Sequence, residues 1–534
     1  MDFPQLYPRP KSLRVADSAM RPPLSLRLVE DPDLAPQEFR LSGAGSCCEL
    51  RSNNAAGLRY GLRAWEQIQA SGIPQEFEIH DAPAFPTRGF MLDVSRCKVP
   101  TMETLLGLLP LLAGLRYNQL QLYIEHSFAF ADHEVVWKDA SPFTGDEIRH
   151  IADECAKLGI ELVPNLNSFG HMERWLQHPA YAHLAECPDG FSEPYESAHG
   201  TTLYPDAASL QFLDSLYAEY LPHFPGELFN IGCDETWELG VGRAKAACES
   251  RGKERVYLDF LGKIEGLVRA RGRKTMFWGD IILRQPELIG QLPDGIIALN
   301  WGYEANHPFE SETAQFRESG VPFYVCPGTS SWNSITGRTA NWLANLAAAA
   351  EHGAANGAIG YLVTDWGDNG HHQTLPISVP GIVAGAGFSW GMQNRDADFA
   401  AVMDQQVFHD EAGVLGQLLL DLGRVADLVP WQRDNCSIFG HILRYGEALE
   451  FAEFADCHTE LDALEVRLAN AQPEEPFVID EIRHSIALAR HAMTRGPDLP
   501  DLVARHRELW LRRNRPGGLK ESCERLTNPW KQAK

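Results

Sequence analysis

Near-continuous apolar runs recur along the middle of the chain, between about residue 85 and residue 394. Positions that stay apolar in succession, rather than alternating with polar ones, indicate strands buried on both faces, as in a parallel sheet. The pattern therefore predicts eight strands: Gly89–Val94, Gln119–Ile124, Ile160–Pro164, Leu228–Cys233, Thr275–Trp278, Ile296–Trp301, Pro322–Cys326 and Ile359–Thr364.

Stretches with helical periodicity lie between most of these runs: Met102–Leu115, Asp146–Leu158, Ala207–Tyr220, Glu254–Arg271 and Asn341–His352. Thr144 and Glu147 form a capping box before the second of them. Eight strand–helix repeats predict an α/β fold of the (β/α)8 TIM barrel type. A doubly wound open sheet is the alternative. No glycine-rich phosphate-binding motif follows any run, which disfavours a nucleotide-binding version of that sheet.

The two ends of the chain differ from the barrel region in their pattern of apolar and polar residues. Residues 1–84 mix short β-like runs with one helical stretch, Ala55–Gln69, and predict a small α+β domain. The pattern predicts that the barrel spans residues 85–394 and that residues 395–534 form an α-helical region. Three arrangements stay open for those helices: packing on the barrel, forming a homodimer interface, or reaching a neighbour's pocket.

Charge and composition narrow the classes of partner. The 534 residues include 47 basic and 72 acidic side chains, which gives a formal net charge of −25. Such a balance argues against nucleic acid and against anionic membranes, since both need clustered Lys and Arg. The N-terminus has no apolar signal segment, and the eleven cysteines form no C-x-x-C pair. We therefore expect a cytoplasmic protein without a disulfide framework or structural zinc.

Charged and aromatic side chains gather where the runs end, which in a barrel of this type is the active-site face. Carboxylates, a histidine pair and four tryptophans stand there: Glu125, His126, His171, Asp234, Glu235, Trp278, Trp301, Trp332, Trp366 and Asp368. Each alone has a structural explanation, such as a core tryptophan or a helix cap. Together they suit a sugar, because pyranose rings stack on aromatic faces and their hydroxyls need charged hydrogen-bond partners.

The adjacent pair Asp234 and Glu235 is the sharpest feature of this set. Both carboxylates reach the same mouth only if the strand has already ended at this point. We expect each carboxylate to raise the pKa of the other. A site that separates the pKa values of two such acids can keep one of them protonated near neutral pH. An acidic helix N-terminus is the alternative interpretation.

The runs Arg88–Arg96 and Phe229–Glu235, together with Asn54–Gly61 in the first domain, resemble the glycoside hydrolase family 20 β-N-acetylhexosaminidases. The likeness covers most of the chain and is closer to the divergent, intracellular branch of that family.

This resemblance implies retaining hydrolysis in which the 2-acetamido oxygen of the substrate attacks the anomeric carbon and forms an oxazolinium intermediate. It makes Glu235 the general acid and base, and Asp234 the partner of the acetamide nitrogen. Arg88 would grip the outer hydroxyls, Trp278, Trp301 and Trp366 would wall the acetamide pocket, and Asp368 would contact the outer hydroxyls. His171 would support Glu235, and Glu125 or His126 would orient His171. No metal or organic cofactor is implied.

Several positions depart from the family pattern. Asn230 and Cys233 replace the usual His and Gly before the acid pair, and Asp368 stands where Glu is usual. The shorter side chain of Asp368 leaves the preference between GlcNAc and GalNAc open. The tyrosine that binds the acetamide oxygen has no clear match, so Tyr303 is the candidate substitute, while Trp332 and Asn333 occupy the loop in question.

The sequence thus predicts an exo-acting β-N-acetylhexosaminidase whose partner is a glycan or glycoconjugate with a terminal N-acetylhexosamine. One rival is a retaining glycosidase that acts on a non-acetylated sugar with a protein carboxylate as nucleophile, which needs opposed carboxylates about 5–5.5 Å apart. Another is a non-catalytic sugar-binding protein on the same scaffold. A metal-dependent hydrolase is disfavoured, since His126 and His171 alone make a thin ligand set and His371 and His372 read better as a loop near the mouth.

Overall fold

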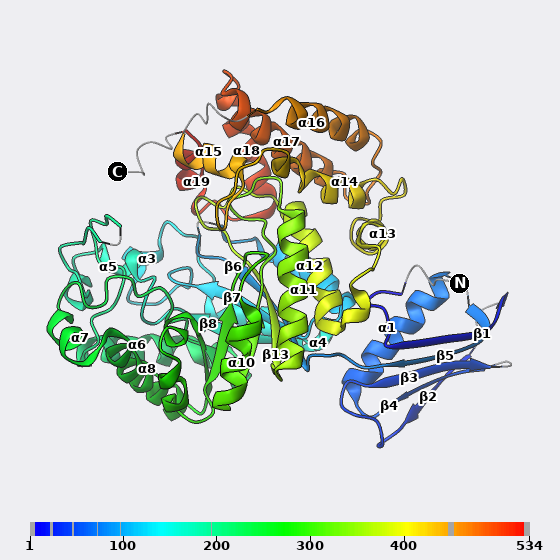
Figure 1. The fold of residues 1–534 in the computed structure, drawn as a ribbon, viewed down its shortest axis with the longest axis horizontal. Coiled ribbons are helices and arrows are strands. Elements are labelled where there is room, and N and C mark those ends of the chain that lie inside the picture. The colour runs from blue at the N-terminus through cyan, green and yellow to red at the C-terminus, as the bar shows by residue number, and fades with distance from the viewer. Residues whose placement is uncertain are drawn as a thin grey trace.

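A computed structural model describes residues 6–21, 25–44, 47–71, 73–96, 98–193, 195–446 and 453–527. At its centre is a closed barrel of eight parallel strands in the order β10-β11-β12-β13-β6-β7-β8-β9 (Figure 1). All eight predicted runs form these strands, which confirms the TIM barrel and excludes the open sheet. Their bounds are β6 (Thr87–Asp93), β7 (Gln119–Ile124), β8 (Glu161–Leu166), β9 (Leu228–Asn230), β10 (Lys274–Trp278), β11 (Ile297–Trp301), β12 (Phe323–Cys326) and β13 (Gly360–Asp365).

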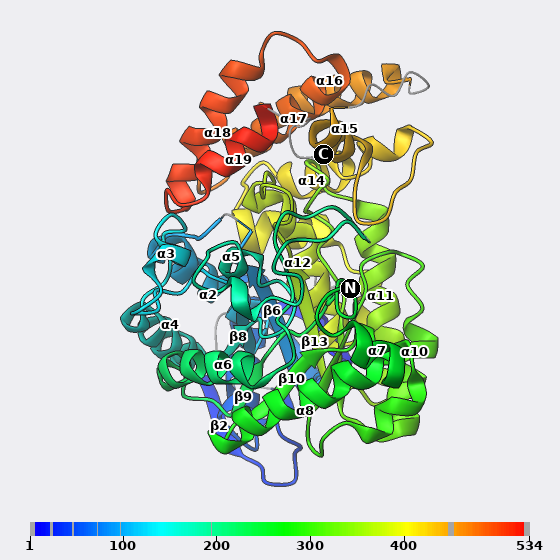
Figure 2. The same ribbon diagram turned by 90° about the vertical axis from the view of Figure 1, so that its left-hand side faces the viewer.

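Helices surround the barrel and bury the outer faces of its strands (Figure 2). The longer ones are α2 (Met102–Gly114), α4 (Gly145–Leu158), α6 (Ala207–Tyr220), α8 (Lys253–Ala270), α10 (Phe309–Ser319), α11 (Thr339–Ala355) and α12 (Leu375–Trp390). Short helices α3 (Glu134–Trp137), α5 (Glu173–Leu176), α7 (Lys245–Arg251) and α9 (Asp280–Leu283) sit in the loops. The predicted capping box of Thr144 and Glu147 is present at α4. A separate apolar cluster fills the barrel interior and ends in tryptophans at its mouth.

The N-terminal domain is a five-stranded sheet in the order β1-β5-β3-β4-β2 that packs on one helix (Figure 1). Its elements are β1 (Ser12–Arg21), β2 (Ser25–Glu30), β3 (Phe39–Ala44), β4 (Cys47–Ser52), α1 (Ala55–Ser71) and β5 (Ile73–Asp81). Trp390 from α12 enters the core of this domain, and its indole N–H donates to Asp81. Asp81 also pairs with the buried guanidinium of Arg116 at 2.9 Å, so a buried ion pair joins the domain to the barrel.

The C-terminal helices lie over the ends of the strands that carry the predicted site (Figures 1 and 2). They are α13 (Phe399–Met403), α14 (Leu415–Leu422), α15 (Ile438–Tyr445), α16 (Ala455–Leu468), α17 (Phe477–Thr494), α18 (Leu499–Arg513) and α19 (Leu519–Thr527). Ion pairs tie this region to helices of the barrel: Arg515, between α18 and α19, pairs with Glu147 of α4, and Glu521 of α19 pairs with Arg174 of α5. Of the three arrangements open from the sequence, the structure shows packing on the chain's own barrel. Within the described ranges, no helix is long and apolar enough to cross a membrane.

Candidate active site

Asp234 and Glu235 follow β9 in a loop that turns sharply. Gly232, Cys233 and Glu235 all have positive φ, at 66°, 70° and 48°. This left-handed backbone is costly for residues with a side chain, and such strain is concentrated at functional sites. Its effect is to bring both carboxylates to one imidazole: Nε2 of His171 lies 3.2 Å from Asp234 Oδ2 and 3.3 Å from Glu235 Oε2.

Buried polar side chains hold this loop in its conformation. Asn230 Oδ1 accepts from the backbone N–H of Gly232, and Asn167 Oδ1 accepts from the N–H of Cys233. The Tyr257 hydroxyl donates to the carbonyl of Cys233 at 2.9 Å. Asn230 and Cys233, which depart from the family pattern, are both fully buried. They shape and pack the loop under the acid pair and leave the acids themselves in place.

A second polar layer orients His171. The Arg96 guanidinium lies 2.9 Å from Glu125 Oε1, and its other end is 3.4 Å from His171 Nδ1. Glu125 Oε1 also accepts from the Tyr123 hydroxyl at 2.9 Å. The carboxylate of Asp93 accepts from the backbone N–H of Arg96 and anchors it at the end of β6. Arg96 therefore lies beside the acid pair with its planar group over the rings of Tyr123 and Trp366.

The charges around His171 set the ionisation of the site. Burial alone lowers the pKa of His171, but the carboxylate of Asp234 and the hydrogen bonds to both acids outweigh burial and raise that pKa well above its usual value. Burial alone raises the pKa of Glu235, but the hydrogen bond and charge of His171, with Arg96, lower it below the ordinary value. The expectation that each acid raises the pKa of the other is therefore wrong for Glu235, because a cation stands between the two carboxylates.

Aromatic side chains form the inner wall of the mouth. Trp301 stacks on Tyr303 with ring centroids 5.2 Å apart, and Trp332 meets Tyr303 edge-on at 5.1 Å. Trp278 lies 6.0 Å from Trp366, whose indole N–H donates to the Tyr303 hydroxyl at 2.8 Å. The structure thus brings together all five predicted aromatic residues.

Buried polar atoms in this wall point to a polar ligand. Oδ1 of Asp234 and the indole nitrogens of Trp278 and Trp332 are buried and have no hydrogen-bond partner among the described residues. Buried polar atoms normally have a hydrogen-bond partner in a folded protein, so a bound ligand could supply one here. Nearby, burial together with the charges of Asp234 and Glu235 raises the pKa of Asp280 to about 8.

Asp368 lies on the opposite rim, in the loop after β13. Its carboxylate accepts from the side-chain amide of Asn333 at 3.1 Å, and burial raises its pKa to about 6. A pocket of about 340 Å³ opens between Asp368 and Glu235. Its other polar lining residues include Arg96, Glu125 and His171, with Arg444, Glu521 and Arg525 from the C-terminal helices.

Comparison with known proteins identifies this barrel. The model described as "Glycosyl hydrolase family 20, catalytic domain" matches residues 85–332. The chain carries a glycosyl hydrolase family 20 catalytic domain. The acid pair, Arg96 and four of the five aromatic residues lie within the matched residues, and Trp366 follows them in the chain.

The family 20 domain has curated relatives and structural neighbours. "Hexosaminidase D" of Homo sapiens is 24% identical over 315 residues, which are 53% of this chain and 62% of that protein. The Bos taurus protein of the same name is 26% identical over 234 residues, 41% of this chain and 65% of that protein. The match thus spans less than two thirds of either relative. The solved "chitobiase" of Flavobacterium johnsoniae shares the fold, with a TM-score of 0.61 at 16% identity over 97% of this chain and 99% of that chain.

Two predicted residues, Arg88 and His126, lie apart from both the acid pair and the aromatic wall. Arg88 stands at the start of β6, at the far end of the barrel, and is 1% exposed. Its guanidinium donates to the carbonyls of Arg116 and Phe85 and to the Tyr60 hydroxyl. Arg88 is therefore a packing residue between barrel and N-terminal domain, and the prediction that it grips the sugar is wrong.

His126 is the second correction. Its ring lines a separate groove, together with Arg174, Gln177 and His178, instead of the pocket with Glu235. Burial lowers its pKa to about 3. Glu125, the residue before it, is the one that reaches His171, at 3.7 Å. Of the two candidates for orienting His171, the structure selects Glu125.

Sequence reasoning missed several pocket residues. Arg96 carried a usable signal, because it follows the end of β6, where the site lies, whereas Arg88 stands at the start of that strand. Trp237, two residues after Glu235, also lines the pocket. Arg444, Glu521 and Arg525 come from helices far along the chain, and no pattern around them marks a site. Within the described ranges, no group of three or more His, Cys, Asp or Glu side chains is placed to hold a metal ion.

Proposed function

We propose that this protein is an exo-acting, retaining β-N-acetylhexosaminidase that works by substrate-assisted catalysis. The observation that carries the proposal is the pairing of a buried, unpartnered Oδ1 on Asp234 with a Glu235 carboxyl group that is 33% exposed to the pocket. The buried Oδ1 of Asp234 is suited to accept a hydrogen bond from the amide N–H of the substrate. The partly exposed carboxyl group of Glu235 is suited to exchange protons with substrate and water. The names of the relatives and neighbours, hexosaminidases and a chitobiase, support the same substrate class.

In the proposed first step, the acetamide oxygen of the terminal sugar forms a bond to the anomeric carbon as the glycosidic bond breaks. Glu235 gives its proton to the leaving oxygen. Asp234 accepts a hydrogen bond from the acetamide N–H and stabilises the positive charge that develops on the closing ring. A bound sugar also removes water from Glu235, which raises its pKa toward that of a working acid.

In the second step, ionised Glu235 takes a proton from water, whose oxygen attacks the anomeric carbon. The bond to the acetamide oxygen breaks, the acetamide re-forms, and the product leaves with the β configuration retained. His171 keeps Asp234 and Glu235 in their relative positions throughout, because its Nε2 contacts both. Arg96 and Asp368 face the pocket from the side that would receive the outer hydroxyls.

The enclosure of the pocket supports exo action on a single terminal sugar. The aromatic residues belong to the apolar cluster that fills the barrel interior, and loops and C-terminal helices line the pocket around Glu235. An internal position of a long glycan needs a cleft open at both ends.

The test is a three-arm assay with the aryl β-glycosides of GlcNAc, GalNAc and unacetylated glucosamine. We expect turnover of one or both acetylated substrates and essentially none of the amino sugar, which has no acetamide oxygen. Comparable rates on the amino sugar would indicate a protein nucleophile and overturn the mechanism. Binding of the acetylated sugars without turnover at any pH between 4 and 8 would overturn the enzymatic function.

A further inference from the structure

A loop between α5 and α6 forms one rim of the sugar pocket. Residues 185–193 and 195–204 of this loop are described, and together they are called the 185–204 segment. Tyr195 and Thr201 of the segment line the pocket that also holds Glu235. Tyr195 is 44% exposed, and the two proposed reaction steps give its ring no role.

Electrostatic neighbours place Tyr195 and Asp368 at opposite ends of this pocket. Burial of its hydroxyl, together with charges that include those of Glu238 and Glu235, raises the pKa of Tyr195 to about 12. The carboxyl of Asp368 also responds to Glu235, but its other neighbours include Arg444 from α15. The general acid therefore lies between two rims, one with Tyr195 and the other with Asp368.

Two buried glutamates fix the 185–204 segment to the loop that carries the acid pair. Glu238 of that loop is fully buried, and its carboxylate accepts four hydrogen bonds, from the backbone N–H groups and the hydroxyls of Thr201 and Thr202, at 2.6–2.8 Å. In the other direction, the carboxylate of Glu186 accepts from backbone N–H groups of residues 240–244. Buried polar groups that are fully paired in this way hold a structure rigid. The rim that carries Tyr195 is therefore built before a ligand binds.

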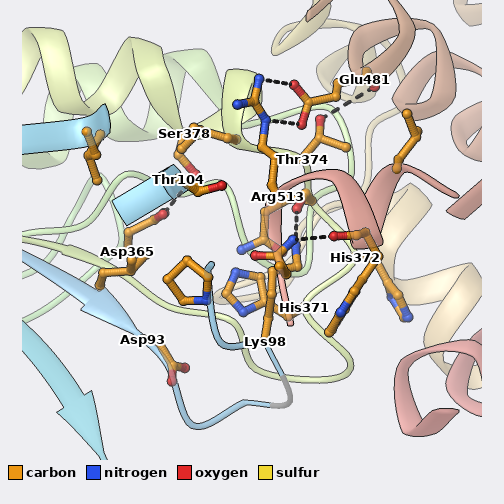
Figure 3. Close-up of a pocket in the computed structure, with 18 of the residues that line it drawn as sticks. Asp93, Lys98, Thr104, Asp365, His371, His372, Thr374, Ser378, Glu481 and Arg513 are labelled. Carbon is orange, nitrogen blue, oxygen red and sulfur yellow. Dashed lines mark hydrogen bonds and ion pairs between the residues drawn. The ribbon is translucent and has the colours of Figure 1, made fainter. Parts of the chain in front are cut away.

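The rim of Asp368 has a separate support, which lies in the loop after β13. The Thr374 hydroxyl of this loop donates to the carbonyl of Glu481 on α17 at 3.4 Å (Figure 3). The Ser522 hydroxyl on α19 donates to the carbonyl of Gly370 at 2.6 Å. The C-terminal helices thus hold this rim, and a change in the 185–204 segment can alter one rim while the other stays in place.

We propose that Tyr195 contacts a second sugar, the one released as the leaving group, and that Glu238 positions Tyr195 by fixing the 185–204 segment. This inference rests on the proposed hydrolase function and makes the substrate a glycan with at least one further pyranose behind the terminal N-acetylhexosamine. A general acid lies within hydrogen-bond reach of the oxygen that it protonates, so the leaving group begins at the exposed carboxyl of Glu235.

The next ring of the glycan then lies beside Tyr195. The aromatic ring suits the apolar face of a pyranose, and the carboxylate of Glu173, which also lines the pocket, suits its hydroxyls. An alkyl chain in the same place would remove water from Glu173 without giving it a hydrogen bond, which is costly. The chemistry of this rim therefore favours a sugar over a lipid as the leaving group.

Two non-hydrolysable ligands that differ by one ring test the proposal in isothermal titration calorimetry. One is an S-linked disaccharide, in which a terminal GlcNAc or GalNAc is joined through sulfur to position 4 of GlcNAc. The other is the methyl 1-thioglycoside of the same terminal sugar. The ratio of the two affinities measures the contribution of the second ring alone. We expect the wild-type protein to bind the better of the two disaccharides about tenfold more tightly than its methyl counterpart.

Tyr195→Ala should lower this ratio about three- to tenfold, whereas Tyr195→Phe keeps the ring and should stay within about twofold of the wild type. Glu238→Gln places an amide NH2 against the donors of Thr201 and Thr202 and should lower the ratio as well. The double variant should be no lower than Tyr195→Ala alone, because Glu238 acts through Tyr195. Leu428→Ala, at an exposed site in the C-terminal region, is the matched control and should keep both affinities.

Circular dichroism checks that each variant is folded, and if Glu238→Gln does not fold, the Tyr195 variants still decide whether the second ring is bound there. A wild-type protein with a ratio near one overturns the proposal, as does an unchanged ratio in Tyr195→Ala. Equal losses of both ligands in Tyr195→Ala would place this residue on the terminal sugar and overturn the proposal as well. Additive effects in the double variant would overturn the positioning role of Glu238.

The three-arm turnover assay separates this inference from the proposed function. The expected affinity ratio without turnover overturns the hydrolase and leaves the contact with the second sugar standing. Turnover of the acetylated substrates with a ratio near one overturns the contact and leaves the hydrolase standing.

Discussion

The imidazole Nε2 of His171 lies 3.3 Å from the carboxylate of Glu235, and this contact lowers the pKa of the proposed general acid. The free site is therefore poised with Glu235 ionised and His171 charged. Substrate entry must shift that balance, because the first step needs a proton on Glu235. The relationship makes Glu235 and its neighbours the natural place to test the mechanism.

Glu235→Gln removes the exchangeable proton and keeps the shape of the side chain. We expect kcat on a substrate with a poor leaving group, such as chitobiose, to fall by about 10²–10⁴-fold, the usual contribution of general acid–base catalysis. An activated aryl glycoside should lose much less in its first step, since its leaving group needs little protonation. Pre-steady-state measurement of aryl alcohol release separates that step from hydrolysis. Equal losses on both substrates in that step would mean that Glu235 does not act mainly as the acid.

Asp234→Asn should slow both substrates alike, because Asp234 acts on the acetamide whatever the leaving group. The expected loss in kcat is about 10²–10³-fold, as when one preorganised electrostatic contact is removed from a transition state. Affinity for a thiazoline analogue of the oxazolinium intermediate should fall in parallel. A variant that keeps its thiazoline affinity while losing activity would contradict this role.

Arg96 and Arg88 offer a matched pair of substitutions. Arg96→Met should cut kcat/KM sharply, since Arg96 lines the pocket and contacts Glu125 and His171. Arg88→Met should leave the kinetic constants of the folded enzyme near those of the wild type. It should instead lower the free energy of unfolding by about 1–3 kcal/mol or more, because the Tyr60 hydroxyl and two buried carbonyls lose their partner.

Steady-state kinetics and urea unfolding on both variants show which arginine affects activity and which affects stability. If Arg88→Met raised KM with unchanged stability, the assignment of Arg88 to packing would be wrong.

Asp368 links the site to pH through its raised pKa of about 6. A carboxyl with a raised folded-state pKa binds its proton more tightly in the native state, so its contribution to stability falls as pH rises from about 4 to about 6. Asp368→Asn has no such proton and should gain stability relative to the wild type over this interval. The relative gain is at most about 3 kcal/mol and should stay level above pH 6.

Chemical denaturation at a series of pH values measures this difference, and activity assays should show the cost in sugar binding. A difference that shrinks as pH rises from 4 to 6 would mean that the pKa of Asp368 is lowered instead.

The sequence predicted the architecture well because burial on both faces leaves a direct mark on strand composition, as in Gln119–Ile124. The acid pair was also visible, since Asp234 and Glu235 adjoin a strand end. Arg88 and His126 were misplaced for local reasons: one stands at the wrong end of its strand, and the other points away from its neighbour Glu125. Arg444 and Arg525 were invisible, because their place in the pocket depends on how distant helices dock. The lowered pKa of Glu235 likewise depends on His171, which comes from another strand's loop.

Gly170 shows how tightly that docking is set, and it yields the last prediction. A Cβ at this position would lie 2.1 Å from the backbone carbonyl oxygen of Asp234, closer than any real contact. Gly170→Ala must therefore push the loop of His171 away from the loop of the acid pair, although it changes no polar group. We expect a large loss of kcat together with a destabilisation of about 1–3 kcal/mol, typical of overpacking. Gly107→Ala, on α2 with no atom within 4 Å of its new methyl group, is the control and should keep full activity. A Gly170→Ala enzyme with wild-type kcat would show that the two loops need no such close approach for catalysis.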